Sequence, residues 1–266
     1  MIRVERLSFA YPDGGFQPGS GSGPDDGLAL SDISLTLPAS SLCWLLGVNG
    51  SGKSTLLSLL AGLFEPLGGT IALADGSPAY PGESARKKGG QQGLRAAFVP
   101  QNPDTYLMGA TVREDLLLST DPIGDGAQEA VALATELGLA PLLDRPVHAL
   151  SYGQKRKLCL ASALASGPEL LLLDEPFSGL DHPSALVVRQ VLARNRERGL
   201  LQVITGHTLD MAGDMADLFV VLQAGRLVCQ GDGAAVFPRL ASHGIRPPCW
   251  WYTGGQGPLW LSPHSG

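Results

Sequence analysis

The segment from Gly47 to Thr55 reads Gly-Val-Asn-Gly-Ser-Gly-Lys-Ser-Thr, and its residue types and spacing suit the binding of phosphate groups. It follows a short apolar run and precedes leucines at helical spacing, so we expect a strand, a tight loop and a helix in that order. Glycines let the loop curl until successive backbone N–H groups point at phosphate oxygens, and the helix start adds a partial positive charge. The sequence therefore predicts a phosphate-binding loop.

Individual side chains of this loop have distinct expected roles. Lys53 is placed to reach the β- and γ-phosphates of a nucleotide, the Ser54 hydroxyl to ligate Mg²⁺, and Thr55 to help hold the α-phosphate. The expected nucleotide contacts in the loop are Gly47, Asn49, Gly50, Ser51, Gly52, Lys53, Ser54 and Thr55. The alternative interpretation is a glycine-rich strand–helix turn with an exposed lysine.

Two adjacent acids, Asp174 and Glu175, follow the apolar run 170–173. Acids at a strand end can simply face solvent. In a chain with a phosphate-binding loop, however, an apolar strand ending in aspartate is where a second Mg²⁺ contact belongs. Asp174 would hold the metal through water. Glu175 would face the γ-phosphate and polarise the attacking water as a general base.

The elements that must position these groups follow from apolar periodicity and from glycine and proline clusters. Strands are expected over 2–10, 33–37, 42–46, 68–74, 96–99, 170–173, 201–205, 218–222 and 226–230. Helices are expected over 53–62, 112–118, 127–137, 154–165 and 184–197, with loops over 11–27 and 75–93. Strands alternating with helices, plus one all-helical stretch, predict an α/β core that carries a helical subdomain.

Composition excludes several classes of protein. The 266 residues include 44% hydrophobic and 17% charged side chains, which is typical of a globular chain. A net charge of −6 argues against broad nucleic-acid binding. The apolar runs are too short to cross a bilayer, and residues 1–5 do not begin a signal peptide. The four scattered cysteines lack metal-ligand spacing, so we expect buried free thiols in a reducing cytoplasm.

A five-residue segment, Leu150-Ser-Tyr-Gly-Gln154, resembles the signature of ABC ATPases, which usually reads Leu-Ser-Gly-Gly-Gln. The order of the surrounding motifs extends the resemblance over nearly all of residues 1–232. That order is Tyr11, the phosphate-binding loop, Gln101, the signature, Asp174-Glu175, residues 178–181 and His207. The resemblance implies a P-loop NTPase core of the RecA-like type, with an ABC-type antiparallel β subdomain and an inserted α-helical subdomain.

The same resemblance implies a division into domains. The ABC ATPase domain would span residues 1–232, with its core in 1–101 and 166–232 and its helical subdomain near 102–165. Residues 233–266, in which the regular patterns fade, would form a C-terminal tail of unassigned role.

ABC ATPases pair head to tail, so the resemblance implies that ATP and Mg²⁺ bind between one phosphate-binding loop and the signature of a second ATPase subunit. That subunit could be the same chain or a related one. Ser151, Gly153 and Gln154 would contact the partner's ATP, with Ser151 and the Gly153 N–H gripping the γ-phosphate from a helix N-terminus. ATP binding would close the dimer and hydrolysis would reopen it. Asp181 would communicate across the interface.

The remaining family positions complete the expected active site. Tyr11 would stack on adenine, although a strand-end aromatic can also belong to the core. Gln101 would touch Mg²⁺ and the attacking water. His207 would hydrogen-bond the γ-phosphate and steady Glu175, the alternative being a surface histidine at a strand end. The expected catalytic set is Lys53, Gln101, Glu175 and His207, and the expected Mg²⁺ ligands are Ser54, Gln101 and Asp174.

The sequence also departs from the family pattern. Tyr152 stands where the signature usually has its first glycine, and it adds bulk next to the partner's nucleotide. Because Ser151 and Gly153 remain, we expect a competent signature with altered closure. Gly206-His207-Thr208 replaces the Thr-His-Asp that is usual in the family. The supporting contact that the aspartate makes in the family is therefore in question here. The loop over 12–27 is longer than usual.

Residues 101–104 and 107–115, reading Gln-Asn-Pro-Asp and Leu-Met-Gly-Ala-Thr-Val-Arg-Glu-Asp, resemble the ATPases of energy-coupling factor (ECF) importers. These importers take up vitamins or transition metals such as cobalt and nickel. The resemblance implies an ATPase that drives uptake of a small solute through separate transmembrane subunits, bound peripherally at the cytoplasmic face of the membrane. In that family this segment forms the groove for a coupling helix; otherwise it is an ordinary polar turn followed by a helix.

Other functions stay open at this point. One is a soluble ABC ATPase acting on nucleic acid or ribosomes, which the acidic charge and the lack of zinc-type cysteines disfavour. Another is the ATPase of a non-ECF ABC transporter. A third is a nucleotide-gated module without turnover, which the presence of Glu175 and His207 argues against.

Two further segments have simple interpretations. Lys155, Arg156 and Lys157 lie on the signature helix, where a solvated helix face is expected and attraction to phosphate or a membrane surface is the secondary interpretation. Residues 249–252, Cys-Trp-Trp-Tyr, are either a patch packed on the core or a partner surface.

Overall fold

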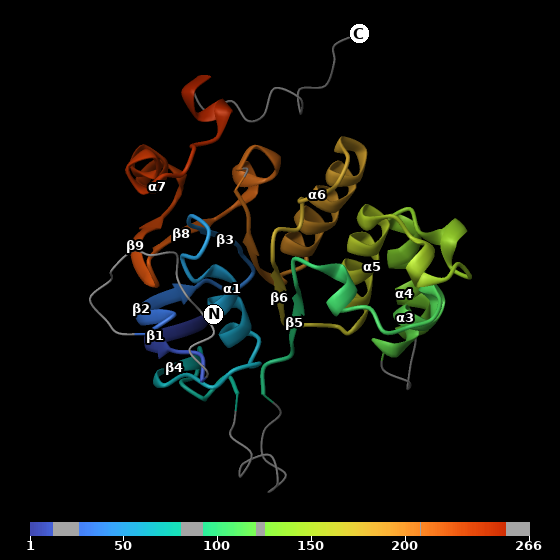
Figure 1. The fold of residues 1–266 in the computed structure, drawn as a ribbon, viewed down its shortest axis with the longest axis horizontal. Helices are drawn as coiled ribbons and strands as arrows, with labels where there is room; N and C mark the ends of the chain where they lie inside the picture. The colour runs from blue at the N-terminus through green and yellow to red at the C-terminus, as the bar shows by residue number, and fades with distance from the viewer. Residues whose placement is uncertain (13–26, 81–92, 121–125, 208, 254–266) are drawn as a thin grey trace, which may run out of the picture.

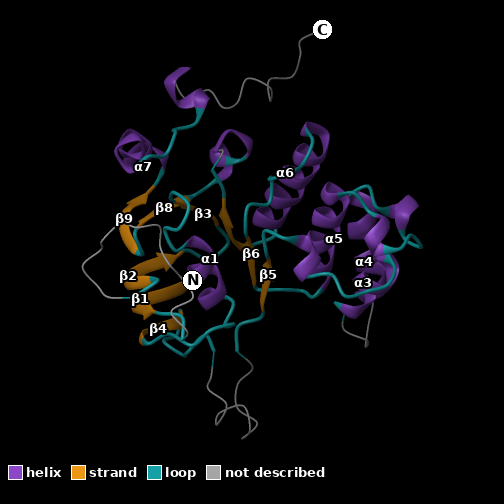
Figure 2. Ribbon diagram, in the orientation of Figure 1, coloured by secondary structure: helices purple, strands orange, loops and turns teal. Residues whose placement is uncertain are grey.

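The structure is a computed structural model that describes residues 1–12, 27–80, 93–120, 126–207 and 209–253 (Figure 1). The expected strands and helices are present, most within three residues of their expected ends. The expected loops over 11–27 and 75–93 lie largely outside the described residues, as do Thr208 and Trp260. Figure 2 shows two sheets on one side of the molecule and a group of helices on the other.

The larger sheet has six described strands in the order β5-β6-β7-β3-β8-β9. Neighbours from β5 to β8 run parallel, and β9 returns antiparallel to β8. The strands are β3 (Leu42–Leu46), β5 (Ala96–Val99), β6 (Leu170–Leu173), β7 (Leu201–Thr205), β8 (Leu218–Gln223) and β9 (Arg226–Gly231). Strands β3, β6 and β7 are buried throughout, because elements cover both faces of a parallel sheet.

Alternate residues of β3 show how the two faces differ. Leu42, Trp44 and Leu46 belong to an apolar cluster shared with the helical subdomain. Cys43 and Leu45 belong to a second cluster on the opposite face, shared with the smaller sheet. The strand therefore separates two cores, as the two-residue side-chain period of a strand requires.

The smaller sheet is antiparallel, in the order β2-β1-β4, as expected for the antiparallel subdomain. Its strands are β1 (Ile2–Phe9), β2 (Leu30–Leu37) and β4 (Gly68–Leu73). Helix α1 (Lys53–Leu60) contributes four buried leucines to the cluster that joins this sheet to the larger one. Packing against both sheets fixes α1, and with it the loop that precedes it.

The helical subdomain consists of α3 (Val112–Leu118), α4 (Gly126–Glu136) and α5 (Tyr152–Ala165), which pack on one another beside β5 (Figure 1). A Thr111–Glu114 capping box starts α3, and a Ser151–Gln154 capping box starts α5. Helix α6 (His182–Glu197) follows β6 and packs against β7.

The C-terminal segment is more regular than expected. Helix α7 (Gly233–Val236) and two short 3₁₀ helices, Phe237–His243 and Cys249–Thr253, follow β9. Phe237 is buried, and its ring lies 5.6 Å from Trp250 and 5.3 Å from Trp251 between centroids. Residues 249–252 thus pack on the core through their tryptophans.

The cysteines follow the expectation in part. Cys43, Cys159 and Cys229 are buried free thiols, and burial raises the pKa of the Cys43 thiol to about 11. Cys249 is exposed, so the expectation of burial was wrong for this residue, which begins a short surface helix. Within the described ranges, every helix is too short or too polar to cross a bilayer.

Candidate active site

Three glycines shape the predicted phosphate-binding loop between β3 and α1. Gly47, Gly50 and Gly52 all have positive φ angles, which glycine adopts without strain. Any side chain at Gly47 would also collide with its surroundings, because a Cβ there would lie 2.2 Å from the Ser51 Oγ. Helix α1 starts after Gly52 with neither a side-chain cap nor an acid in its first turn. Its N-terminal N–H groups are therefore available to an anion.

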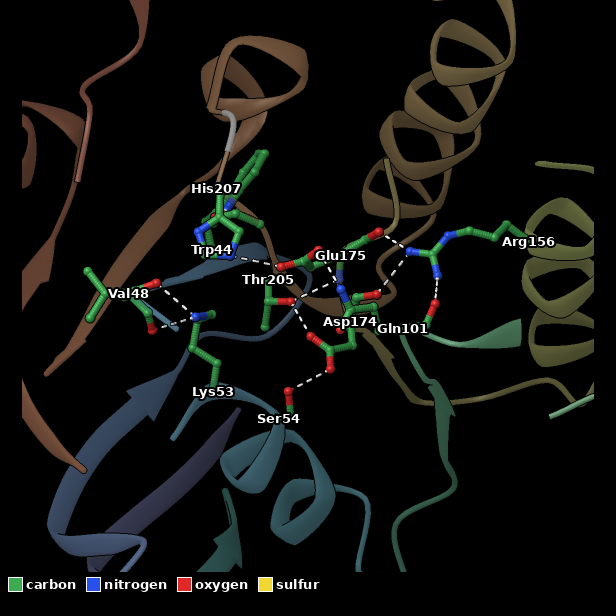
Figure 3. A network of polar contacts seen from close by, with 12 residues as sticks. Trp44, Val48, Lys53, Ser54, Gln101, Arg156, Asp174, Glu175, Thr205 and His207 are labelled. Carbon is green, nitrogen blue, oxygen red and sulfur yellow. Dashed lines mark hydrogen bonds and ion pairs between the residues drawn. The ribbon is translucent and has the colours of Figure 1, made fainter. Parts of the chain in front are cut away.

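Lys53 is 8% exposed, and its ammonium lies inside this loop (Figure 3). The Nζ donates hydrogen bonds to the carbonyls of Gly47 at 2.8 Å and Val48 at 3.0 Å. Burial lowers the pKa of Lys53, while the nearby Asp174 and Glu175 act in the opposite direction. The loop carbonyls thus hold an ammonium group at the place where the sequence predicts a phosphate.

Asp174 and Glu175 come from the end of β6 and enter the same site. Asp174 is buried and accepts hydrogen bonds from the Ser54 hydroxyl at 2.7 Å and the Thr205 hydroxyl at 2.6 Å. Thr205 also accepts a hydrogen bond from the Glu175 N–H at 2.9 Å. Thr205, the last residue of β7, therefore ties the two acids together. Its role could not be predicted from the sequence, since a threonine that ends a buried strand carries no distinctive signal.

The Glu175 carboxylate is held at both oxygens. Gln101 Nε2 donates to Oε2 at 2.9 Å, and His207 Nε2 lies 2.9 Å from Oε1. The Glu175 backbone has a φ of +52°, a left-handed conformation that is strained for a residue other than glycine. Strain of this kind persists only where the surroundings fix it. Gln101 follows β5, Glu175 follows β6 and His207 follows β7, so one edge of the sheet assembles the three side chains.

These groups line one open cavity of about 410 Å³. Its lining residues are Asn49, Gly50, Gly52, Lys53, Ser54, Thr55, Gln101, Asp174, Glu175 and His207. All were predicted as site residues from the sequence. The cavity thus brings Lys53 and Glu175 to one place, the juxtaposition that phosphoryl transfer to water requires.

The oxygen donors of this cavity fit a magnesium ion. Ser54 Oγ and Asp174 Oδ2 lie 2.7 Å apart, and Gln101 adds an amide group at the same opening. Hydroxyl, carboxylate and amide oxygens are the hard donors that Mg²⁺ prefers. The buried Ser51 Oγ has no hydrogen-bond partner among the described residues, so the loop also retains an unsatisfied polar atom. No group of three His, Cys, Asp or Glu side chains in the described ranges offers a transition-metal site.

Tyr11 lies beside the cavity and is partly buried. Its hydroxyl shares a 3.0 Å hydrogen bond with Thr55 Oγ1. Its ring contacts Phe9 and Phe64 edge to face, with centroid distances of 5.0 and 5.7 Å. Tyr11 is therefore packed in an aromatic cluster near the start of α1 and still touches the loop. This position fits both interpretations of the residue, as a core aromatic and as a side chain that stacks on adenine.

The predicted signature residues lie away from this cavity. Ser151 is exposed at the N-terminus of α5, where its hydroxyl accepts from the Gln154 N–H at 3.3 Å. Gly153 and Gln154 belong to the same helix start. Asp181 caps α6 by accepting from the Ser184 N–H at 2.9 Å, and hydrogen bonds with the Ser184 side chain and N–H lower the pKa of its carboxyl. A second molecule can reach Ser151, since nothing in the described residues buries it.

Arg156 departs from the expected solvated helix face. Its side chain is buried, with the residue 4% exposed, and it points from α5 towards the ends of β5 and β6 (Figure 3). The guanidinium donates to the carbonyls of Pro100, Gln101, Asp174 and Glu175. The expectation of a solvated residue was wrong because four backbone carbonyls from the ends of β5 and β6 meet beside this helix and accept hydrogen bonds from the guanidinium.

Trp44 explains one departure from the family pattern. Its ring is fully buried, and its Nε1 donates to the Gly206 carbonyl at 3.4 Å. A Cβ at Gly206 would lie 3.3 Å from the ring, closer than ordinary van der Waals contact. The indole thus occupies the space that a larger residue before His207 would need.

Comparison with known proteins places these features in a family. A family model described as "ABC transporter" matches residues 30–178. The cobalt import ATP-binding protein CbiO of Rhodobacter capsulatus is 36% identical over 257 residues, covering 93% of this chain and 85% of that protein. The energy-coupling factor transporter ATP-binding protein EcfA of Carboxydothermus hydrogenoformans is 32% identical over 253 residues, covering 93% and 87%. The structure of cbiO1 from Clostridium perfringens, part of the ABC transporter complex cbiONQ, superimposes with a TM-score of 0.70 at 28% identity, covering 89% and 90%.

Proposed function

Because this chain belongs to the ABC transporter family and is one of its ATP-binding, ATP-hydrolysing subunits, we propose that it powers uptake of a small solute through separate membrane subunits. The cobalt-import relative supports a transition-metal ion as the solute, and a vitamin is the alternative that the resemblance to ECF ATPases implies. The subunit would sit peripherally at the cytoplasmic face of the membrane.

One observation carries the hydrolytic part of the proposal: Glu175 is held by Gln101 and His207 in the cavity that also contains Lys53. In this arrangement Lys53 and the loop N–H groups bind the triphosphate. Glu175 accepts a proton from the attacking water, Gln101 orients that water, and His207 steadies both Glu175 and the γ-phosphate. Ser54, Asp174 and Gln101 would hold Mg²⁺, which would supply positive charge to offset that of the phosphates.

Replacing Glu175 with glutamine tests the general base. The Glu175→Gln variant keeps the size of the side chain but cannot accept the proton, so we expect ATP turnover to fall at least about a hundredfold. ATP affinity, measured with a fluorescent ATP analogue, should stay within about threefold, since the phosphate contacts remain. The matched control is Glu169→Gln, which removes an exposed carboxylate paired with Arg95. Wild-type turnover by Glu175→Gln would reject this role.

Removal of the metal gives a second test. Chelation of Mg²⁺ should abolish hydrolysis. Added Mg²⁺ should restore it, because Ser54 and Asp174 can then bind the ion again. Asp174→Asn should raise the Mg²⁺ concentration needed for half-maximal activity. An unchanged magnesium requirement in that variant would remove Asp174 from the proposed metal site.

Three exposed apolar residues support docking of a membrane subunit on the helical subdomain. Met108, Leu117 and Leu118 are 82%, 43% and 62% exposed; Met108 lies within the segment that resembles ECF ATPases, and the two leucines follow it. Exposed apolar side chains gathered in one region are typical of interaction surfaces. Met108→Glu with Leu118→Glu should abolish co-purification with the membrane subunits while leaving hydrolysis by the isolated subunit intact. Retained co-purification would place the docking surface elsewhere.

A further inference from the structure

The buried guanidinium of Arg156 connects two chain segments that carry reactive side chains. Nη1 donates to the carbonyls of Pro100 and Gln101, and Nη2 donates to those of Asp174, at 3.1 Å, and Glu175. The planar guanidinium presents its donors in a fixed fork, so its two terminal nitrogens can hold acceptors from two chain segments in one geometry. The backbone positions of Gln101 and Glu175 are therefore set from the same side chain.

Tyr152 reinforces this connection from one turn earlier in α5. Its hydroxyl donates to the Gln101 carbonyl at 3.0 Å, so the same oxygen accepts from both Tyr152 and Arg156. Residues four apart lie on one face of a helix, and the Arg156 Cζ is 5.9 Å from the centre of the Tyr152 ring. The other edge of the ring packs on Gly179, where a Cβ would lie 2.6 Å from it.

Tyr152 and Arg156 both lie on α5, the helix whose N-cap is Ser151. Its exposed N-terminus is the part offered to a partner's nucleotide in the proposed dimer. Its buried side holds the backbone of Gln101 and Glu175, whose side chains face this chain's own nucleotide cavity. A small rotation or shift of α5 on dimer closure thus moves both groups of contacts together, since packed elements move as units.

We propose that Arg156, assisted by Tyr152, is a positioning residue for ATP hydrolysis: it fixes Gln101 and Glu175 of one site to the helix that presents Ser151 to the other site. This inference rests on the proposed roles of Glu175 and the signature. It also gives a function to Tyr152, which stands where the signature usually has a glycine: its hydroxyl is a second donor to the Gln101 carbonyl.

The first test compares Arg156→Gln and Arg156→Lys in the purified full-length protein. Glutamine cannot span both chain segments, so kcat should fall at least about tenfold, as expected for lost hydrogen bonds to a charged donor. Affinity for a fluorescent ATP analogue should stay within about threefold, because Lys53 and the loop are intact. Lysine restores the charge and some of the contacts, so Arg156→Lys should lie between glutamine and wild type.

A second readout separates positioning from a merely structural role. If α5 couples the two sites, the Hill coefficient of hydrolysis against ATP should fall towards 1 in Arg156→Gln. Amide hydrogen exchange should accelerate in peptides covering residues 99–101 and 173–176 and stay unchanged in β8. The matched control is Arg194→Gln, which removes an arginine that joins α6 to Glu136 on α4.

If Arg156→Gln does not fold, Tyr152→Phe provides a second test of the same inference. The variant removes one hydroxyl from a side chain that is 44% exposed, so folding should be preserved. We expect kcat to fall about two- to fivefold with unchanged ATP affinity, in keeping with one neutral hydrogen bond. Wild-type kcat and Hill coefficient in folded Arg156→Gln, or equal losses of kcat and affinity, would overturn the inference. If Glu175→Gln is inactive in the same assays, the proposed function is retained and only the inference about Arg156 is rejected.

Discussion

Glu175 shows how individual hydrogen bonds hold a reactive side chain in an unfavourable backbone conformation. Its positive φ is maintained by the Thr205 hydroxyl on its N–H and by Arg156 on its carbonyl. Its carboxylate is fixed separately by Gln101 and His207. The proposed base is thus oriented by groups of the protein itself, which would reduce the rearrangement that the reaction needs.

Thr205→Val tests this arrangement at the residue scale. Valine matches the shape of threonine but removes the donor to Asp174 and the acceptor for the Glu175 N–H. We expect a destabilisation of about 1–3 kcal/mol, measured by urea unfolding, and a fall in ATP turnover of about tenfold. Thr135→Val is the control, because its hydroxyl donates to the Val131 carbonyl one turn earlier on an exposed helix face. Unchanged stability and turnover in Thr205→Val would contradict the assigned role.

At the scale of elements, parallel strand order does most of the assembly. Strands β5, β6 and β7 are adjacent, so the residues that follow them meet although they are separated by 74 and 32 positions. The phosphate-binding loop follows β3, the next strand in the sheet. Helix α5 then packs across the ends of β5 and β6 and holds them through Arg156.

Gly179→Ala tests the contact between α5 and the turn before α6. Alanine at φ +72° is strained, and its Cβ would lie 2.6 Å from the Tyr152 ring. We expect a loss of stability larger than the roughly 1–2 kcal/mol associated with left-handed backbone alone. Gly76→Ala is a matched control, with φ +83° and no atom within 4 Å of its Cβ. Adding Tyr152→Ala should recover the difference between the two variants in thermal unfolding; without recovery, the clash is not the cause.

The elements could be predicted from the sequence because their signals are local. Alternating and helical apolar patterns located the strands and helices, and glycine spacing located the loop before α1. Arg156 and Thr205 could not be assigned in this way, because their partners come from other strands. Whether a charged residue on a helix is solvated or buried depends on which carbonyls the tertiary structure leaves unpaired beside it. The two departures at Tyr152 and Gly206 also became explicable only through their contacts with Gly179 and Trp44.

At the scale of the whole molecule, the C-terminal segment is part of the folded body. Phe237 packs edge to face on Phe219 of β8 at 4.8 Å, and Leu240 and Val236 are fully buried beside it. The Cys249 N–H also donates to Asp210, which follows the His207 loop, at 2.6 Å. Residues 233–253 thus extend the core that supports the active site.

Phe237→Ala measures how far this segment stabilises the molecule. Removing a buried aromatic side chain should lower the free energy of unfolding by about 3–5 kcal/mol. Tyr252→Ala is the control, since that side chain belongs to a residue 71% exposed and should change stability by no more than about 0.5 kcal/mol. Equal effects of the two substitutions in denaturant titrations would mean that the segment is not integrated into the core.

The contacts of Trp44 have a practical consequence. Its indole N–H meets the carbonyl directly before His207, and its ring stacks on Phe177, two residues beyond Glu175, at 6.5 Å. Indole fluorescence responds to changes in nearby dipoles and rings, so any displacement of these neighbours alters its emission. With Trp250, Trp251 and Trp260 replaced by phenylalanine, the fluorescence of Trp44 reports displacements of Gly206 and Phe177, and thus of the segments next to His207 and Glu175, without an attached dye.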